Sequence, residues 1–447
     1  MKIQRLVFGV LALVGLIGAN SSAQTPECAS RSQRLAALET DLKGNQNAES
    51  LKAFWKDVEN AGTPIVERIP NDRAEVLVTF VWRGSSSAKQ VFIFPQIEST
   101  AATEKMKMNR LLDTNLWYKT YCLPEDSRFT YGFYEAPTRV ENDSPLSHVD
   151  QLKPDQFNSR RFEFPPHDSV EGGTTVVFSL FESPHSPGRS WSTADAAARG
   201  GTVETKTILS KVLGKQRRVW VYRSPPNVEG AKPPALLILF DGFDYLHEIP
   251  APTILDNLVR TKQIPGFVAV LVDNPPQTRT QDLLCSDRFD EFVATELAPW
   301  AREQYGVSPN PGQAIVGGSS LGGLAAACTA LRYPEVFGNV LSESGAFWWS
   351  PQGEKQGEWV AQRVASSKPV PIKWHLDVGV FEDVPAPNGG SVTNLAANRH
   401  LRDVLRARGY AVDYSEFSGG HEFVNWQSSM AFGLIHLCRD FPTGQMR

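Results

Sequence analysis

The sequence predicts two domains, an all-β N-terminal domain followed by an α/β domain with a parallel sheet. Two patterns indicate this. Short runs of alternating β-branched and aromatic residues, separated by Gly, Asn, Asp and Pro, occupy much of the chain before residue 165. After residue 175, near-continuous apolar strands alternate with helical segments, as in a parallel sheet that is covered on both faces. A chain of 447 residues is also long enough for two substantial cores.

The N-terminus has the layout of a secretory signal peptide. Lys2 and Arg5 precede the apolar run Leu6–Ile17, and small residues at 21–23 offer a cleavage site before Gln24. The run is shorter than the roughly 20 residues that a transmembrane helix needs. We therefore expect a signal peptide over residues 1–23, export, and no membrane span after signal cleavage. The alternative is an N-terminal anchor that stays uncut.

Composition and cysteine content narrow the class of protein. The net charge is −4 with charges of both signs mixed along the chain, so nothing indicates a nucleic-acid partner. An exported chain with five cysteines can keep disulfides, and the odd number leaves at least one thiol unpaired. We expect Cys328 to pack as a small apolar residue in a core helix. No Cys or His cluster has metal-ligand spacing, so we expect no metal and no cofactor.

The N-terminal domain is predicted over residues 28–165. It starts with a helical region, residues 28–60, in which the apolar positions are Leu35, Leu38, Leu42 and Leu51. The runs AEVLVTFVWRG, KQVFIFP and SRFTYGFYEA that follow are typical of an all-β sandwich. The proline- and charge-rich segment 154–169 shows no periodicity, and we place the domain boundary near it.

The second domain is predicted over residues 175–447. We expect strands at RRVWVYRSP, ALLILFDG, FVAVLVDN, QAIVG, KWHLDVGV and VDYSEF. Helical segments lie between them, from RFDEFVATELAPWAREQYG to a last helix near NWQSSMAFGLIHLC. This order of elements is that of an α/β hydrolase.

Residues 318–322, Gly-Ser-Ser-Leu-Gly, fit the pattern G-x-S-x-G at a predicted strand-to-helix junction. The central Ser320 is the predicted nucleophile, and glycine is needed on either side because a β-carbon would clash where strand and helix crowd together. The backbone N–H of Leu321 lies at a helix N-terminus, which favours a developing oxyanion. A second oxyanion donor is expected after LLILFDG, either the backbone N–H of Phe243 or that of Gly242. The alternative is a glycine-rich helix start without chemistry.

A serine nucleophile needs a positioned base, and in this fold the histidine comes late in the chain, after the acid. His421 follows two glycines and precedes a helix, in FSGGHEFVNW, which is a loop position at the carboxyl edge of the sheet. The other late histidines lie in a predicted strand (His375) or in predicted helices (His400 and His436), so we expect them to be structural. His421 is therefore the predicted base.

The acid that orients this imidazole should follow the preceding strand, in WHLDVGVFED. Glu382 lies early in the loop after Gly379 and is the first choice. Asp383 is the second choice, and Asp377 is expected to remain in the strand. The alternatives are a loop carboxylate that is only solvated and a catalytic pair without an acid.

Together these motifs resemble the enterobactin esterase family, the hydrolases of catecholate siderophores. In the second domain the resemblance rests on GSSLGG, YPEVFGNVLSESGAFWW, DGFDYL, RTQDLLCSDRFDEFVATELAPW, GVFED and GGHEFVNW. In the first domain VTFVWRG, TNLWYKTYCLPEDSRFTYGF and KPDQFN are similar to the immunoglobulin-like domain of that family. The resemblance therefore covers both domains.

The resemblance implies a serine esterase that hydrolyses the ester bonds of ferric enterobactin or a related catecholate siderophore and so releases iron. It implies the same catalytic roles for Ser320, His421 and Glu382. Arg279 matches an arginine of the family. The motif reads RTQDLL here, so Asp282 is one methylene shorter than the glutamate of the family motif. Together with the signal peptide, the resemblance implies a periplasmic enzyme.

A ferric tri-catecholate is a bulky anion with aromatic faces, so its binding site should offer arginine and aromatic side chains. We expect Arg279 and three tryptophans, Trp348, Trp349 and Trp426, to contact the substrate. The alternatives are a surface ion pair for the arginine and core positions for the tryptophans.

Two other functions are compatible with the sequence. One is a feruloyl or other carbohydrate-linked ester hydrolase, which shares the elbow and the GGH layout. The other is a non-catalytic protein that binds a siderophore or a carbohydrate on a hydrolase scaffold. The intact Ser320, His421 and loop acid count against the second.

Overall fold

The computed structural model describes residues 31–44, 47–70, 72–97, 103–138, 151–195, 200–225, 233–353, 357–385 and 392–441. The predicted signal peptide, residues 1–23, lies outside these ranges. None of the helices within them is long and apolar enough to cross a membrane. The chain divides into two compact units. The N-terminal unit comprises the chain up to Pro187 together with Ser418–Glu422, and the C-terminal unit comprises the remainder, Gly188–Phe417 and the chain from Phe423.

The N-terminal unit begins with two helices, α2 (Gln33–Lys43) and α3 (Asn47–Ala61). Leucines at helical spacing, Leu35, Leu38 and Leu42, lie on the buried side of α2 and join one cluster with the apolar side chains of α3. The prediction of a helical region is confirmed for the described residues, and the leucines predicted as its apolar positions lie in these two helices.

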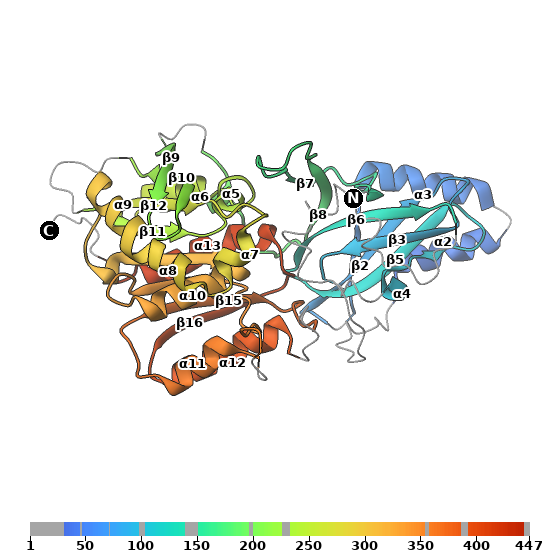
Figure 1. Cartoon of the computed structure of the whole chain (residues 1–447). Coiled ribbons are helices and arrows are strands. Elements are labelled where there is room, and N and C mark those ends of the chain that lie inside the picture. The colour runs from blue at the N-terminus through green and yellow to red at the C-terminus, as the bar shows by residue number, and fades with distance from the viewer. Residues whose placement is uncertain are drawn as a thin grey trace. The chain divides into compact units, whose positions relative to one another are not determined.

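Two antiparallel four-stranded sheets follow, with the strand orders β1-β2-β5-β4 and β3-β6-β8-β7 (Figure 1). The strands are β1 (Ile65–Arg68), β2 (Glu75–Arg83), β3 (Gln90–Pro95), β4 (Asn109–Arg110), β5 (Leu116–Pro124), β6 (Arg128–Ala136), β7 (Arg161–Phe164) and β8 (Val176–Glu182), with a short helix α4 (Thr103–Met106) after β3. Aromatic side chains of the two sheets meet in the core: the Phe80 ring on β2 lies 4.7 Å from Tyr131 on β6 and 6.1 Å from Phe181 on β8, between ring centroids. The predicted β-sandwich is therefore confirmed.

The boundary between the domains lies later than the sequence indicates. β8 pairs with both β6 and β7, so the sandwich continues to Glu182, and the prediction that the second domain begins at residue 175 was wrong. Segment 154–169 is likewise no plain connection, because β7 lies within it. A four-residue strand such as β7 is too short to produce a visible alternation.

The C-terminal unit is built on an eight-stranded sheet of order β16-β15-β14-β13-β11-β12-β10-β9. Neighbouring strands from β16 to β12 are parallel, and β10 runs antiparallel to β12 and β9. The strands are β9 (Thr202–Ser210), β10 (Lys215–Arg223), β11 (Ala235–Leu239), β12 (Phe267–Val272), β13 (Ala314–Ser319), β14 (Asn339–Glu343), β15 (Lys373–Gly379) and β16 (Ala411–Phe417). Every residue of β11, β12, β13 and β14 is buried, which explains why β11 and β12 are continuous apolar runs and why β13 combines apolar and small residues.

Helices cover both faces of this sheet (Figure 1). They are α5 (Gly242–His247), α6 (Ala251–Arg260), α7 (Arg279–Leu283), α8 (Asp287–Phe292), the π-helical turn η4 (Val293–Leu297), α9 (Ala298–Tyr305), α10 (Leu321–Arg332), α11 (Trp359–Ser366), α12 (Asn394–Ala407) and α13 (Phe423–Leu437), with short 3₁₀ turns η3 (Ser190–Ser192) and η5 (Pro311–Gln313). Gly323 of α10 lies against Ser342, and Gly433 of α13 lies against Leu341. Because successive residues of a strand point to opposite faces, α10 and α13 cover opposite faces of β14. The predicted α/β-hydrolase-like order of elements is confirmed.

The cysteines correct one expectation. Cys328 on α10 forms a disulfide with Cys285, so the prediction that it packs only as a small apolar residue was wrong. Its place on the buried side of α10 suits both a thiol and a half-cystine, and the partner lies 43 residues away in the sequence. Cys122 is also disulfide-bonded, and Cys438 is a buried free thiol.

Candidate active site

The predicted nucleophile elbow is present between β13 and α10. Ser320 separates the two elements with φ 57° and ψ −119°, a conformation that is costly for a residue with a side chain. The elbow is tight: a Cβ on Gly318 would lie 2.8 Å from the backbone of Gly322. Ser320 Oγ is buried and has no hydrogen-bond partner within the described ranges. A strained serine with an unpaired hydroxyl fits a nucleophile, and its catalytic role stays a prediction.

Backbone hydrogen bonds hold the elbow in this conformation. The Ser320 N–H donates to the Glu343 carbonyl at 2.9 Å, and the Ser320 carbonyl accepts from the N–H of Ala346 at 3.0 Å. The neighbouring Ser319 differs, because its hydroxyl hydrogen-bonds the buried Tyr245 hydroxyl. The serine that is engaged in the core is thus Ser319, in agreement with Ser320 as the reactive one.

A buried acid lies directly behind the elbow. Tyr245 donates its hydroxyl hydrogen to Glu343 Oε2 at 2.5 Å, and Ser429 Oγ donates to Glu343 Oε1 at 2.8 Å. Burial, reinforced by the nearby Asp377 carboxylate, raises the pKa of Glu343 to about 8. Sequence reasoning missed this group, because Glu343 lies in a strand, β14, that was not predicted.

The predicted structural histidines have carboxylate partners of their own. His375 Nδ1 lies 2.7 Å from Asp413, His400 Nδ1 lies 2.8 Å from Glu358, and His436 lies 3.5 Å from Asp413. Burial alone would lower the pKa of His375, but the Asp377 and Asp413 carboxylates raise it to about 9. Asp377 itself is buried in β15, as predicted.

Glu382 is the best-held carboxylate of the acid loop. It is 3% exposed, and its oxygens accept from Ser344 Oγ at 2.5 Å, the Gly379 N–H at 2.8 Å and Asn394 Nδ2 at 2.6 Å. Asp383 is exposed and accepts from Thr393 Oγ1. A buried carboxylate with fixed donors is a better orienting group than a solvated one, so the geometry favours Glu382 over Asp383.

His421 lies in the loop Ser418–Glu422, which joins β16 to α13. This is the loop position that the sequence predicts, and the loop belongs to the compact N-terminal unit. Its half-buried ring is compatible with a role as base. The pairing of His421 with Ser320 and Glu382 stays a prediction.

The predicted oxyanion donors lie at the start of two helices. Leu321 is the first residue of α10 and Phe243 the second residue of α5, positions where a backbone N–H has no acceptor within its own helix. Asp241, which precedes α5, has φ 54° and ψ 47° and so turns the chain sharply after β11. A Cβ on Gly242 would lie 2.6 Å from the Leu271 backbone, so only glycine fits this turn.

Arg279 has a protein partner. Its Nε and Nη2 donate to the two carboxylate oxygens of Asp241 at 2.8 and 2.7 Å. The Arg279 side chain is 14% exposed and that of Asp241 is 2% exposed. Sequence reasoning did not predict this pair, because its two residues are 38 positions apart, and substrate contact by Arg279 stays a prediction. Asp282 of the same helix is buried and paired with Arg217 at 2.8 Å.

The three tryptophans differ in exposure. Trp426 is 1% exposed and donates its indole N–H to Ser344 Oγ at 3.0 Å. Its side chain thus supports the Ser344 hydroxyl that holds Glu382, and contact of Trp426 with the substrate stays a prediction. Trp348 is also buried, whereas Trp349 is half-buried and packs edge-on against Trp359. Trp349 is thus the most exposed of the three.

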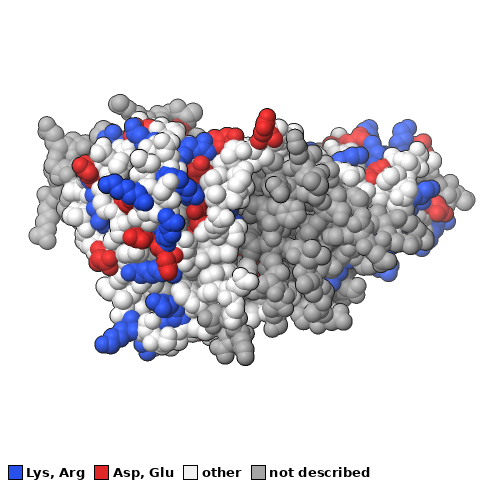
Figure 2. Space-filling model, in the orientation of Figure 1, with Lys and Arg blue, Asp and Glu red and all other residues white. Residues whose placement is uncertain are grey.

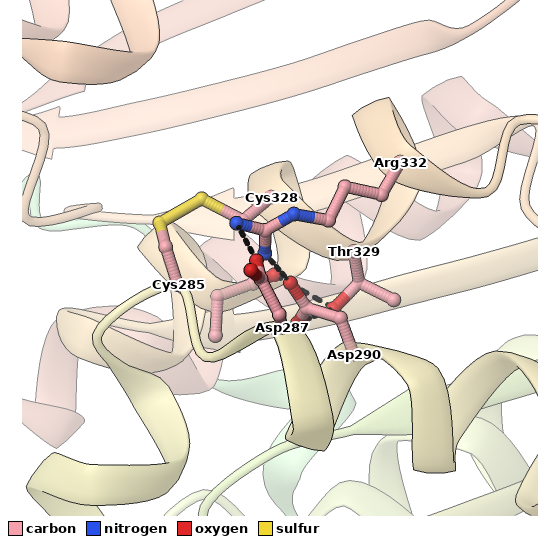
Figure 3. Close-up of a disulfide and its surroundings, with 7 residues drawn as sticks. Cys285, Asp287, Asp290, Cys328, Thr329 and Arg332 are labelled. Carbon is pink, nitrogen blue, oxygen red and sulfur yellow. Dashed lines mark hydrogen bonds and ion pairs between the residues drawn. A yellow bond between two sulfur atoms is a disulfide. The ribbon is translucent and has the colours of Figure 1, made fainter.

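Covalent and ionic contacts anchor the helix that follows Ser320 (Figure 3). The Cys285–Cys328 disulfide joins α10 to the segment before α8. Thr329, the next residue of α10, donates its Oγ1 hydrogen to Asp290 at 2.7 Å, and Arg332, about one turn after Cys328, pairs with Asp290 as well. Burial raises the pKa of Asp290 to about 6, although both partners stabilise its charged form. These contacts fix the position of α10 and hence of the elbow.

No group of three or more His, Cys, Asp or Glu side chains suited to a metal ion occurs in the part of the chain that the structure describes. Acidic and basic side chains are interspersed on the described surface shown in Figure 2, without a field of one sign. The interspersed charges agree with the mixed composition of the sequence.

One family profile, described as "Putative esterase", matches residues 210–437, which include the elbow, the acid loop and the histidine loop. The chain belongs to this esterase family. It is a carboxylic ester hydrolase. A second profile, described as "Enterochelin esterase, N-terminal", matches residues 77–192 of this esterase. The resemblance to enterobactin esterases that the motifs indicate is therefore confirmed.

Individual relatives span both units of the esterase. It is 26% identical over 393 residues to the iron(III) enterobactin esterase of Escherichia coli K12, which covers 84% of this chain and 94% of the relative. It is 24% identical over 420 residues to the iron(III) salmochelin esterase of Escherichia coli O6:H1, with 90% and 96% covered. The crystal structure of ferric enterobactin esterase from Salmonella typhimurium matches with a TM-score of 0.70 at 25% identity, over 87% of this chain and 98% of that chain.

Proposed function

We propose that this esterase hydrolyses the ester bonds of ferric enterobactin, or of a related catecholate siderophore, and so releases the iron. The observation that carries the proposal is the strained Ser320 with its unpaired hydroxyl at a strand-to-helix elbow. Relatives with iron(III) enterobactin and salmochelin in their names match over 94% and 96% of their own length, which supports the siderophore as substrate.

The proposed reaction has two steps. Ser320 Oγ attacks the ester carbonyl while His421 takes its proton, and His421 then gives that proton to the leaving alkoxide. A water molecule, deprotonated by His421, hydrolyses the acyl-enzyme and frees Ser320. The backbone N–H groups of Leu321 and Phe243 bind the oxyanion of each tetrahedral intermediate.

Glu382 is the proposed acid. A buried carboxylate beside an imidazole holds its tautomer and stabilises the imidazolium that forms during the reaction. Ser344 and Asn394 keep Glu382 in one conformation, and Trp426 in turn holds Ser344. Ser344 and Asn394 lie in no recognisable sequence motif, so their support of Glu382 could not be predicted from the sequence.

Substrate recognition is proposed to use aromatic surface and cationic charge. Trp349 has exposed ring area on which a catechol can stack. Arg279 is a second candidate through the part of its guanidinium that remains exposed beside Asp241.

We further propose that the N-terminal sandwich is immunoglobulin-like and that the chain is exported to the periplasm through the signal peptide at residues 1–23. The two antiparallel four-stranded sheets support the first proposal. The Cys285–Cys328 disulfide supports the second, since disulfides persist in oxidising compartments.

The function is tested by product analysis. The full chain is incubated with ferric enterobactin, apo enterobactin and methyl ferulate, and products are identified by mass spectrometry. We expect linear and monomeric catecholate–serine products from enterobactin, no such products from Ser320→Ala, and much of the activity retained by the matched control Ser319→Ala. Hydrolysis of methyl ferulate alone would instead assign a feruloyl esterase, and failure of a fluorophosphonate to label the chain would assign a binding protein.

A further inference from the structure

The loop that carries His421 is held by the N-terminal unit. Residues Ser418–Glu422 pack with the β-sandwich as one compact unit, although the elements on either side of the loop, β16 and α13, belong to the C-terminal unit. Four contacts join this loop to β6 and to Gln96, the residue after β3. These contacts lie on both sides of His421 along the chain.

The backbone of β6 supplies the first contacts. β3 ends at Pro95, opposite Tyr131, so the start of β6 extends beyond its ladder with β3. N–H groups of alternate residues point to the same side of an antiparallel strand. At this open stretch the Arg128 N–H donates to the Ser418 carbonyl at 3.0 Å, and the Thr130 N–H lies 3.0 Å from both carboxylate oxygens of Glu422.

The Thr130 side chain adds a stronger contact. Its Oγ1 donates to Glu422 Oε2 at 2.7 Å. Thr130 is fully buried and Glu422 is 1% exposed. The hydrogen bond is therefore shielded from water, and water cannot replace Thr130 as a donor to the Glu422 carboxyl group. Burial raises the pKa of Glu422 to about 8, and the Thr130 donors oppose that rise.

The residue before His421 is fixed as well. Gly420 lies so close to the Gln96 carbonyl that a Cβ on Gly420 would overlap its oxygen. Gln96 is held in turn, since its N–H donates to the Thr130 carbonyl at 3.0 Å. Both chain neighbours of His421, Gly420 and Glu422, are therefore fixed by the same short stretch of sandwich around Thr130.

We infer that the N-terminal sandwich positions the catalytic base: Thr130 and Glu422 are positioning residues that hold His421 in its reactive orientation. The inference rests on the proposed function, in which His421 is the base. A general base must lie within hydrogen-bond reach of the proton that it abstracts, and a displacement of about 1 Å can cost on the order of 100-fold in rate. The sandwich is then required for hydrolysis of every ester, including esters too small to touch it.

The test uses the full chain and a small neutral ester, 4-nitrophenyl acetate. Thr130→Val keeps the shape of the side chain and removes the hydroxyl donor. We expect kcat to fall at least tenfold with KM changed less than twofold, and the rate of Ser320 labelling by a small fluorophosphonate to fall in parallel. Thr130→Ser restores the donor and should recover most of the rate.

Two further variants separate positioning from stability. The matched control is Thr79→Val, the same change at a buried threonine of the sandwich whose Oγ1 pairs with Thr120 at 3.0 Å. It should lower the melting temperature without lowering kcat. Gly420→Ala pushes the loop away from Gln96 without altering the sandwich, and should lower kcat even if Thr130→Val does not fold.

The outcomes distinguish the inference from the proposed function. If His421→Ala is inactive while Thr130→Val and Gly420→Ala keep the wild-type kcat on the neutral ester, the positioning role is overturned and the base assignment stands. If His421→Ala remains active, His421 is not the base, and both are overturned.

Discussion

Replacing Arg279 with alanine tests what the Asp241–Arg279 pair does. The change removes two hydrogen bonds of 2.8 and 2.7 Å from a carboxylate that is only 2% exposed. Breaking a buried ion pair by removing one partner costs about 3–5 kcal/mol, because the remaining charge is left uncompensated. Asp241 forms the turn that leads directly to Gly242 and Phe243. We therefore expect Arg279→Ala to lower the free energy of unfolding by about 3 kcal/mol or more and to lower kcat on a neutral ester at least tenfold.

The measurements are urea unfolding and steady-state kinetics on 4-nitrophenyl acetate and on ferric enterobactin. The matched control is Arg399→Ala, which breaks a bidentate pair with Glu416 of similar length, 2.8 and 2.7 Å, but with an arginine that is 47% exposed. Exposed pairs contribute about 0–1 kcal/mol. The double variant Asp241→Asn/Arg279→Ala should recover part of the lost stability. The reasoning is refuted if Arg279→Ala is as stable as Arg399→Ala and raises only the KM for the anionic siderophore, because Arg279 would then contact the substrate without supporting the Asp241 turn.

Three further predictions concern the acid, the disulfide and the buried glutamate. Glu382→Gln should lower kcat by tenfold or more, whereas Asp383→Asn should leave it within about threefold, because only the first removes a buried charge from the imidazolium; equal small effects in steady-state kinetics would indicate a Ser–His pair without a required acid. Removing the disulfide with Cys285→Ala and Cys328→Ala should lower the free energy of unfolding by about 4 kcal/mol, as expected for a loop of 43 residues, and an unchanged urea midpoint would contradict this. Glu343 has a pKa of about 8 in the folded protein and about 4.3 when unfolded, so the folded state holds a proton that the unfolded chain loses in this window. The free energy of unfolding should therefore fall as pH rises from 5 to 8, and Glu343→Gln should flatten the fall; a parallel pH profile for the variant would show that Glu343 does not titrate there.

Features encoded in contiguous residues could be predicted from the sequence. The elbow at Ser320 follows from glycine spacing at the end of an apolar run, and the loop position of His421 follows from two glycines before a helix. Glu382 followed from its place after a strand. In each case a few neighbouring residues determine the local backbone, so the pattern is visible without a structure.

Features that depend on distant partners could not be predicted. Thr130 and Glu422 are 292 residues apart, and nothing near either of them indicates the pairing. The periodicity of α10 shows that position 328 is buried but not that Cys285 lies beside it. Trp426 was expected at a substrate surface because it follows His421 closely, yet its position on α13 turns its ring into the core, where it holds Ser344.

The central claim is that Ser320 carries the acyl group of the siderophore during hydrolysis. The most direct measurement is acid-quenched mass spectrometry of the chain during turnover of ferric enterobactin, followed by peptide mapping. The account predicts a catecholate–serine acyl adduct on the peptide that contains Ser320, and neither adduct nor products with Ser320→Ala. Continued hydrolysis of ferric enterobactin by Ser320→Ala, or an adduct on Ser319 instead, would contradict it.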